Sequence, residues 1–94
     1  ADIVVGLFHS GREGGIKTAE YEEDQSLKVA REIPCFDIIL YGHDHSSHED
    51  IVKGPGGNDV LCLDPSCNAF MVSDAKISIT MRDRCMYFLR NVNC

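Results

Sequence analysis

The sequence predicts an α/β fold, in which a strand–helix–strand (βαβ) unit is followed by antiparallel-leaning strands. Apolar runs at residues 2–8 and 36–41 flank a stretch whose apolar residues recur at helical spacing. The second half of the chain holds shorter apolar or alternating runs separated by turn-forming residues. With 94 residues, of which 44% are hydrophobic and 26% charged, the chain has the composition of one small domain.

The first half of the chain predicts the βαβ unit. Residues 2–8 are almost continuously apolar, which is typical of a parallel strand buried on both faces. A glycine-rich loop is expected at residues 9–15. The helix is expected over residues 22–33, with acidic side chains in its first turn and an end at Pro34. A second buried strand then follows at residues 36–41.

The second half of the chain predicts three further strands. The glycine-rich segment 53–59 is expected to form a loop. Strands are expected at residues 59–63, 76–80 and 85–89, with a turn at residues 64–66. Because polar and apolar residues alternate in segment 76–80, one face of that strand should be exposed to solvent.

Charge and hydropathy exclude two classes of partner. The formal net charge is −6 and the nine Lys and Arg residues are scattered, so the chain has no basic stripe for a nucleic-acid duplex. No apolar segment approaches the ~20 residues of a membrane span, and no signal-peptide pattern opens the chain. The chain starts directly in strand-like sequence and stops soon after another apolar run. We therefore expect it to be a piece of a longer protein.

The five cysteines do not predict a disulfide framework. Because their number is odd, at least one thiol must be free or paired with another chain. Cys35 and Cys62 adjoin or lie in apolar runs and are expected to be small buried hydrophobic residues. Cys62 and Cys67 do not have the spacing of a zinc-binding pair. The pattern leaves the disulfide state and the redox compartment open.

Three histidines follow the two strands of the predicted βαβ unit. His9 comes directly after the first strand, and His43 and His45 follow the second strand beyond Gly42. The carboxyl ends of the two parallel strands lie at the same edge of the sheet, where α/β proteins bind ligands. Neutral imidazole is the commonest transition-metal ligand. The sequence thus predicts a metal site formed by these three histidines.

Other readings of these histidines stay open. Each imidazole, taken alone, is more typical of a hydrogen-bonded loop residue or a surface residue, and only their convergence favours the metal site. Asp44 is expected to face solvent or to orient an imidazole. His48 lies in a polar run and is expected to be exposed, where it could capture adventitious zinc or nickel.

Two segments carry a resemblance to a known family. Val-Gly-Leu-Phe-His-Ser-Gly at residues 5–11 and Asp-Ile-Ile-Leu-Tyr-Gly-His-Asp-His-Ser at residues 37–46 resemble the calcineurin-like metallophosphoesterases. The closest branch is the group of 5′-nucleotidases and 2′,3′-cyclic-nucleotide phosphodiesterases. The resemblance extends over nearly the whole chain. It implies that residues 1–94 are a single partial domain, the carboxyl-terminal half of a catalytic domain built as a β-sandwich flanked by helices.

The resemblance also implies a chemistry. In this family two metal ions, which could be zinc, manganese or iron, bridge a hydroxide that attacks the phosphorus of a phosphoester, here expected to be a nucleotide. By resemblance, His9 and His43 would bind one ion and His45 the other. The longer parent protein would hold two ions and this chain at most one. An exported or periplasmic location is expected by analogy alone.

The chain departs from the family pattern in ways that keep several hypotheses open. The family's Asp-x-His, Gly-Asp and Gly-Asn-His-Asp (or -Glu) motifs are absent, and Gly57-Asn58-Asp59 lacks the histidine. Pro65-Ser66-Cys67 stands where Pro-Gly-Ser is frequent. Without the bridging carboxylate there is no two-metal clamp, so we expect the isolated chain to be inactive.

The first hypothesis is that the chain is half of a phosphoesterase domain. The second is that it is a non-catalytic metal-binding or interaction fragment. The third is that the chain has a purely structural role and its histidines bind no metal. The first also predicts an uncovered sheet surface that favours self-association.

Overall fold

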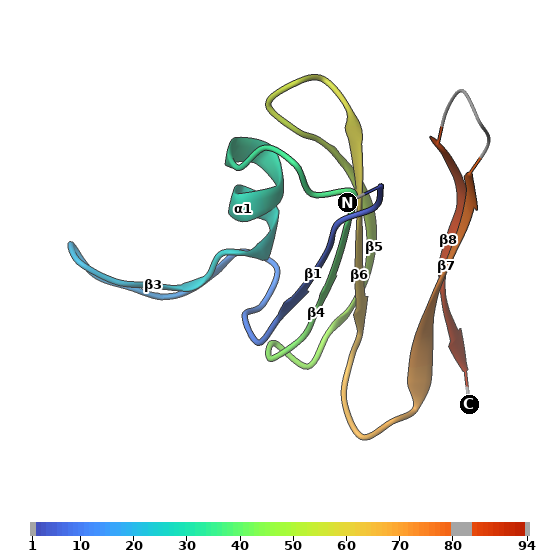
Figure 1. Cartoon of the computed structure of the whole chain (residues 1–94). Helices are drawn as coiled ribbons and strands as arrows, with labels where there is room; N and C mark the ends of the chain where they lie inside the picture. Colours follow the sequence, from blue (N-terminus) through green and yellow to red (C-terminus); the bar gives the residue numbers. More distant parts are fainter. Residues whose placement is uncertain (1, 80–83, 94) are drawn as a thin grey trace.

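The computed structural model describes residues 2–79 and 84–93 of the chain. In this part of the chain it contains eight strands and one helix, arranged in the order shown in Figure 1. The elements are β1 (Val5–Phe8), β2 (Gly14–Lys17), β3 (Glu22–Asp24), α1 (Ser26–Glu32), β4 (Ile38–Tyr41), β5 (Ser47–Lys53), β6 (Asp59–Pro65), β7 (Met71–Ile79) and β8 (Arg84–Asn93).

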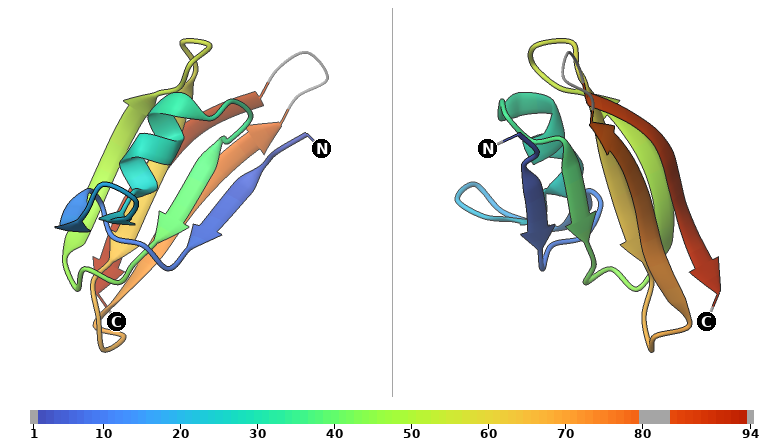
Figure 2. Two further views of the ribbon diagram at one scale, coloured as in Figure 1. Left: turned by 90° about the vertical axis from the view of Figure 1, so that its left-hand side faces the viewer. Right: turned by 45° about the vertical axis from the view of Figure 1, so that its right-hand side comes forward.

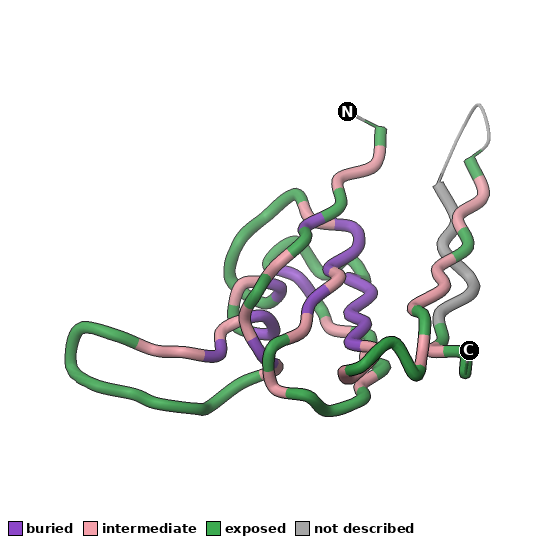
Figure 3. The backbone as a smooth tube through the Cα atoms, turned by 90° about the horizontal axis from the view of Figure 1, so that it is seen from below, coloured by how far each residue is buried: buried purple, intermediate pink, exposed green. Residues whose placement is uncertain are grey.

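The elements form three layers, with a four-stranded sheet in the middle. Helix α1 packs on one face of this sheet, against β4, β5 and β6 (Figures 1 and 2). The β7–β8 hairpin packs on the other side, against β5 and β6. The β2–β3 hairpin projects away from the layers, and its tip is exposed (Figure 3). No helix in residues 2–79 and 84–93 is long and apolar enough to cross a membrane.

The sheet has the order β1-β4-β6-β5 and is mixed. Strands β1 and β4 pair in parallel, which confirms the predicted βαβ unit. Strand β6 is parallel to β4 and antiparallel to β5. The expectation that the later strands are antiparallel is therefore wrong for one side of β6. As a result, β1, β4 and β6 all end at the same edge of the sheet.

The core lies between α1 and the sheet. Leu27 and Ala30 of the helix pack with Ile39, Val60 and Cys62 of β4 and β6, and all five are almost completely buried. Side chains alternate along a strand, so the equally buried leucines of β6 face the hairpin layer. Strand β6 is consequently covered on both faces.

Strand β1 is shorter and more exposed than its apolar sequence predicts. It spans Val5–Phe8 rather than residues 2–8, and Leu7 is 83% exposed. The reason is its place at the edge of the sheet. Among the described strands it pairs only with β4, and it lies beyond the hairpin that covers β5 and β6. The expectation of burial on both faces is wrong, and self-association at this edge stays a prediction.

The helix is also shorter than predicted. It covers Ser26–Glu32, and the acidic segment expected in its first turn forms strand β3 instead. Pairing with β2 holds Glu22–Asp24 in an extended conformation, so no acidic residue lies in the first turn. The helix ends as expected before Pro34, because Ile33 is extended at φ −101° and ψ 123°.

The second half differs from the predictions mainly in strand length. Strand β5 was not predicted, and β6 continues to Pro65, so the turn expected at residues 64–66 comes later. The loop expected at residues 53–59 is present as the short turn between β5 and β6. The strands expected at 76–80 and 85–89 lie within β7 and β8, although Thr80 is outside the described residues.

Three cysteine thiols are free in the described residues. Cys62 is fully buried, as predicted, and burial raises the pKa of its thiol. Cys35 is exposed rather than buried, because it lies after the end of α1 in a turn with φ 87°. Cys67 is free and half-buried. The side chain of Cys85 and the whole of Cys94 lie outside the described structure.

Candidate functional site

Backbone N–H groups in the loop after β1 donate hydrogen bonds to side chains of β3 and of the loop after β4. The N–H of Gly11 donates to Asp24 Oδ1 at 2.7 Å, and the N–H of Arg12 donates to Asp44 Oδ2 at 2.8 Å. A side chain at Gly11 is impossible without rearrangement, because a Cβ there would lie 2.7 Å from Asp24 and 2.8 Å from Asp44. Glycine at position 11 thus lets the two loops approach each other.

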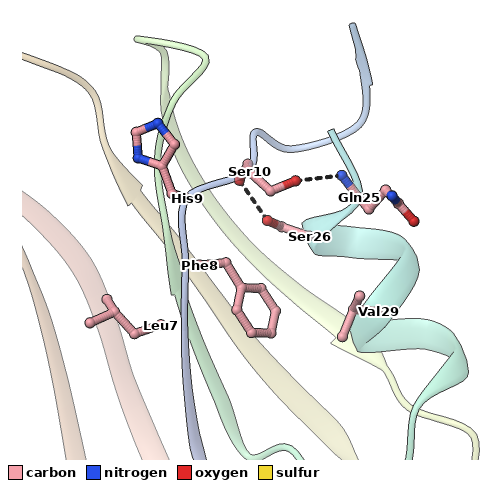
Figure 4. A pocket seen from close by; sticks show the side chains of 7 residues that line it. All are labelled: Leu7, Phe8, His9, Ser10, Gln25, Ser26 and Val29. Atoms are coloured by element: carbon pink, nitrogen blue, oxygen red, sulfur yellow. Dashed lines mark hydrogen bonds between the residues drawn. The ribbon is translucent and has the colours of Figure 1, made fainter. Parts of the chain in front are cut away.

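Ser10 fixes the end of β1 to the start of α1. Its hydroxyl donates to the carbonyl of Glu23 at 2.9 Å and accepts from the N–H of Gln25 at 2.9 Å. Its own carbonyl accepts from Ser26 Oγ at 2.7 Å (Figure 4). These bonds set the direction in which the neighbouring His9 leaves the backbone.

A shallow pocket of about 410 Å³ lies beside this junction. Phe8 points towards the helix, whereas Leu7 and His9 point away from it (Figure 4). The residues that line the pocket come from the end of β1 and the start of α1: Leu7, Phe8, His9, Ser10, Gln25, Ser26 and Val29. His9 therefore lies at the rim of an open surface, within reach of a ligand from solvent.

The structure brings His9 and His43 together. His9 Nε2 and His43 Nδ1 are 3.2 Å apart, and the ring centroids are separated by 4.9 Å. The other ring nitrogen of His43, Nε2, lies 3.5 Å from Glu23 Oε2. His43 thus has one nitrogen directed at the second imidazole and the other at a carboxylate.

The backbone around the histidines is strained. His43 has a φ of 98° and His45 a φ of 57°, in a region that side chains other than glycine rarely adopt. Such conformations cost about 1–3 kcal/mol and concentrate at functional sites. The preceding Gly42 does not have a positive φ, so the strain falls on the histidines themselves.

His45 does not converge with the other two histidines, because no group of ligand atoms among the described residues contains all three. Its side chain is exposed, and it is held through its backbone carbonyl, which accepts a hydrogen bond from Ser66 Oγ at 3.0 Å. Within the described residues its imidazole belongs to no group of converging ligand atoms. The structure therefore joins two of the three predicted ligands.

The pair of histidines fits a transition-metal ion. Two nitrogens bound to one tetrahedral zinc at ~2.0–2.1 Å are separated by ~3.3 Å, close to the 3.2 Å between His9 and His43. A hydrogen bond between neutral imidazoles has the same length. Glu23 contacts the nitrogen of His43 that faces away from His9, which is the place of a carboxylate that orients an imidazole.

A second group of potential ligands lies deeper in the structure. One ligand atom from each of Asp44, His48 and Asp64 lies within 4.8 Å of the others. The expectation that His48 is exposed is wrong, because it is half-buried and its ring stacks on Tyr41, with centroids 6.5 Å apart. His48 Nε2 lies 3.6 Å from Asp44 Oδ2. Asp44 is half-buried and contacts the imidazole of His48 rather than that of His43 or His45.

The two carboxyl groups of this cluster titrate very differently. Burial, followed by the hydrogen bond and charge of Asp44, raises the pKa of Asp64 to about 7. Burial also acts to raise the pKa of Asp44, but hydrogen bonds with Asp64 and from the N–H groups of Arg12 and Ser46 outweigh it and lower the pKa. A single proton shared by the two carboxyls explains both directions.

Arg12 links the loop after β1 to the opposite edge of the sheet. Its Nε donates to Asp50 Oδ2 at 3.0 Å, and its Nη2 donates to Asp50 Oδ1 at 3.1 Å. This two-bond contact is the main reason that the pKa of Asp50 is lowered and that of Arg12 is raised. The loop between β1 and β2 is therefore fastened at both Gly11 and Arg12.

Two residues near the histidines were not predicted from the sequence. Glu23 reaches His43 because the β2–β3 hairpin returns to the sheet edge, which no pattern at residues 14–24 indicates. Asp64 had a usable signal, since it lies near the end of an apolar strand, as His9 follows one. Comparison of the chain with protein-family models, with curated proteins and with solved structures finds no match.

Proposed function

We propose that the chain forms part of the catalytic domain of a metal-dependent phosphoester hydrolase similar to the 5′-nucleotidases, with His9 and His43 as ligands of one divalent ion. The observation that carries the proposal is the 3.2 Å separation of His9 Nε2 and His43 Nδ1 at the carboxyl ends of two parallel strands. The four-stranded sheet would then be half of the family's sandwich. The substrate class is a nucleotide phosphoester.

The chain's own residues would hold the ligands in place. Glu23 contacts His43 Nε2, which favours the tautomer whose Nδ1 is free to bind a metal. The strained φ of His43 and the contacts of Gly11 hold the two imidazoles close before any ion arrives. A bound ion would acidify a water molecule and polarise a phosphoryl oxygen.

A non-catalytic fragment that holds at most one ion at this position is the second candidate. It is favoured because the three histidines do not form one group of ligand atoms in the described residues, and because the bridging carboxylate motif is absent from the sequence. The parent's upstream sequence separates the two candidates. An Asp-x-His motif and a Gly-Asn-His motif there would support the hydrolase, and their absence would leave the fragment.

The ligand assignment is tested by nitrogen NMR of the imidazoles. On addition of Zn²⁺ to the 94-residue chain up to saturation, we expect the ¹⁵N shifts of His9 Nε2 and His43 Nδ1 to move. The ring nitrogens of His45 should stay unchanged and serve as the internal control. Shifts confined to His45, or no shift at His9, would contradict the assignment.

Activity provides the complementary test. The isolated chain should show no turnover of p-nitrophenyl phosphate or a nucleotide with added Mn²⁺ or Zn²⁺. In the longer parent protein, His43→Ala should lower kcat/KM by about 100-fold or more, as expected for loss of a metal ligand. Strong turnover by the isolated chain that His43→Ala abolishes would overturn the expectation of inactivity.

A further inference from the structure

We propose that Asp44, His48 and Asp64 form a separate binding site for a divalent transition-metal ion, which holds the loop carrying His43 and His45 to strand β6. The site uses neither His9 nor His43, so it is independent of the function proposed above. Its ligands come from the loop before β5, from β5 and from β6. An ion there would join three segments that are distant in the sequence.

The fold itself places two of the ligands side by side. His48 and Asp64 are directly opposite each other in the antiparallel pair of β5 and β6. Such cross-strand partners have Cβ atoms about 5 Å apart on the same face of the sheet. Asp44 lies four residues before His48, and its Oδ2 is 3.6 Å from His48 Nε2. Two ligand atoms on one tetrahedral zinc are separated by a similar ~3.3 Å.

The second observation is a buried acceptor that lacks a partner. Asp64 is 0% exposed. Its Oδ1 accepts from the N–H of Ser66 at 3.0 Å, but no donor among the described residues reaches Oδ2 unless the Asp44–Asp64 pair holds a proton. Burying a carboxylate without a donor or a counter-charge is costly, and its nearest ionisable neighbour, Asp44, is another carboxylate. The cluster is therefore short of positive charge.

Among the described residues, the charge that acts on the Asp64 carboxyl is that of Asp44. Arg12 is engaged by both carboxylate oxygens of Asp50. His48 is the single basic side chain in the cluster of ligand atoms. A divalent ion would balance the two carboxylates, and a donor set of two oxygens and one imidazole nitrogen suits zinc, manganese or ferrous iron. The alternative is one proton shared between Asp44 and Asp64, which leaves the pair with one negative charge.

The test uses the full 94-residue chain with His9→Ala and His43→Ala, which removes the first site. We expect this double variant to bind one equivalent of Zn²⁺ by titration calorimetry, and its Tm to rise with Zn²⁺. Adding Asp64→Asn should weaken Zn²⁺ binding by about 100-fold and abolish the rise in Tm. The matched control is Asp59→Asn, an exposed carboxylate at the other end of β6, which should change neither result.

A third variant is needed if circular dichroism shows that the Asp64→Asn variant does not fold. His48→Ala removes a half-buried ligand and should weaken Zn²⁺ binding to a similar degree. The proposal is overturned if the double variant binds no Zn²⁺, which is the result expected for a shared proton. It is also overturned if Zn²⁺ binding persists unchanged in both His48→Ala and a folded Asp64→Asn variant.

Discussion

Strands β1 and β6 have similarly apolar sequences but very different surroundings. Residues 60–64 of β6 are all buried, whereas Gly6 is the one buried residue of β1. Strand β6 lies between two strands and between two covering layers, and β1 lies at the edge of the sheet. The position of a strand in the sheet, more than its composition, therefore decides how deeply it is buried.

The same contrast extends to the polar residues at the ends of these strands. His9 follows the exposed strand and lies on the open surface, while Asp64 belongs to the buried strand and is closed off from solvent. The first position suits a residue at a binding site that small molecules enter from solvent. The second suits a ligand whose role is to hold the structure together.

Truncation of one leucine in each strand should give the largest difference in the free energy of unfolding between β6 and β1. Leu63→Ala removes a completely buried side chain of β6 and should lower the free energy of unfolding by about 3 kcal/mol. Leu7→Ala in β1 should change it by less than about 0.5 kcal/mol, because Leu7 is largely exposed. Urea unfolding measures both, and equal losses would show that β1 is covered in solution.

The burial of β6 should also depend on the hairpin that covers it. Asn91 Nδ2 lies 2.6 Å from the Asp64 carbonyl, 3.1 Å from the His48 carbonyl and 3.0 Å from Ser47 Oγ, to which it can donate. Asn91→Ala should lower the free energy of unfolding by about 2 kcal/mol, because these acceptors lose their donor.

Hydrogen exchange should locate the effect of Asn91→Ala. The amides of β6 and β7 should exchange faster in this variant, whereas those of β1 should not. The control is Asn93→Ala, an exposed position at the end of the same strand, which should leave exchange unchanged. Faster exchange throughout the chain would mean that Asn91 does more than hold the hairpin.

The smallest effect on the free energy of unfolding is expected for the Arg12–Asp50 contact, which fastens the loop after β1 to the far edge of the sheet. Arg12→Lys keeps the positive charge but loses the two-bond contact with Asp50, and should cost about 1 kcal/mol. The pKa of Asp50 is lowered mainly by Arg12, so this stability is present above the ordinary carboxyl pKa and is lost as the pH falls through the lowered value.

Unfolding measured across the acidic range tests this dependence. Arg12→Met should remove the part of the acid-induced loss of stability that Asp50 contributes. Lys17→Met, at an exposed position of β2, is the matched control and should leave the pH dependence nearly unchanged. An identical pH profile for Arg12→Met and the unaltered chain would show that the contact contributes nothing in solution.

The central βαβ unit could be predicted because its strands are apolar runs and its helix ends before a proline. The same order placed His9 and His43 at one edge of the sheet. What the sequence did not reveal depends on pairing: Glu22–Asp24 became a strand because β2 lies beside it, and the alternation in β5 is weak because both of its faces are partly exposed.

Asp64 shows why the rest of the site was missed. Its place at the sheet edge follows from the parallel pairing of β6 with β4. Predicting that pairing requires knowing that β5 forms the outer edge and that β6 lies inside it. The local sequence places Asp64 near the end of an apolar strand but does not give the order of the strands. An apolar strand would pair with a neighbour whether it lay inside the sheet or at its edge.

If His43 binds a metal ion as proposed, its positive φ sets stability against metal binding. Glycine adopts this conformation without strain, so a library of variants at position 43 sorted for thermal resistance should enrich glycine. The same library sorted for metal retention should enrich histidine. The two selections would then favour different residues at position 43, and the chain carries histidine, the residue that the proposed metal site requires.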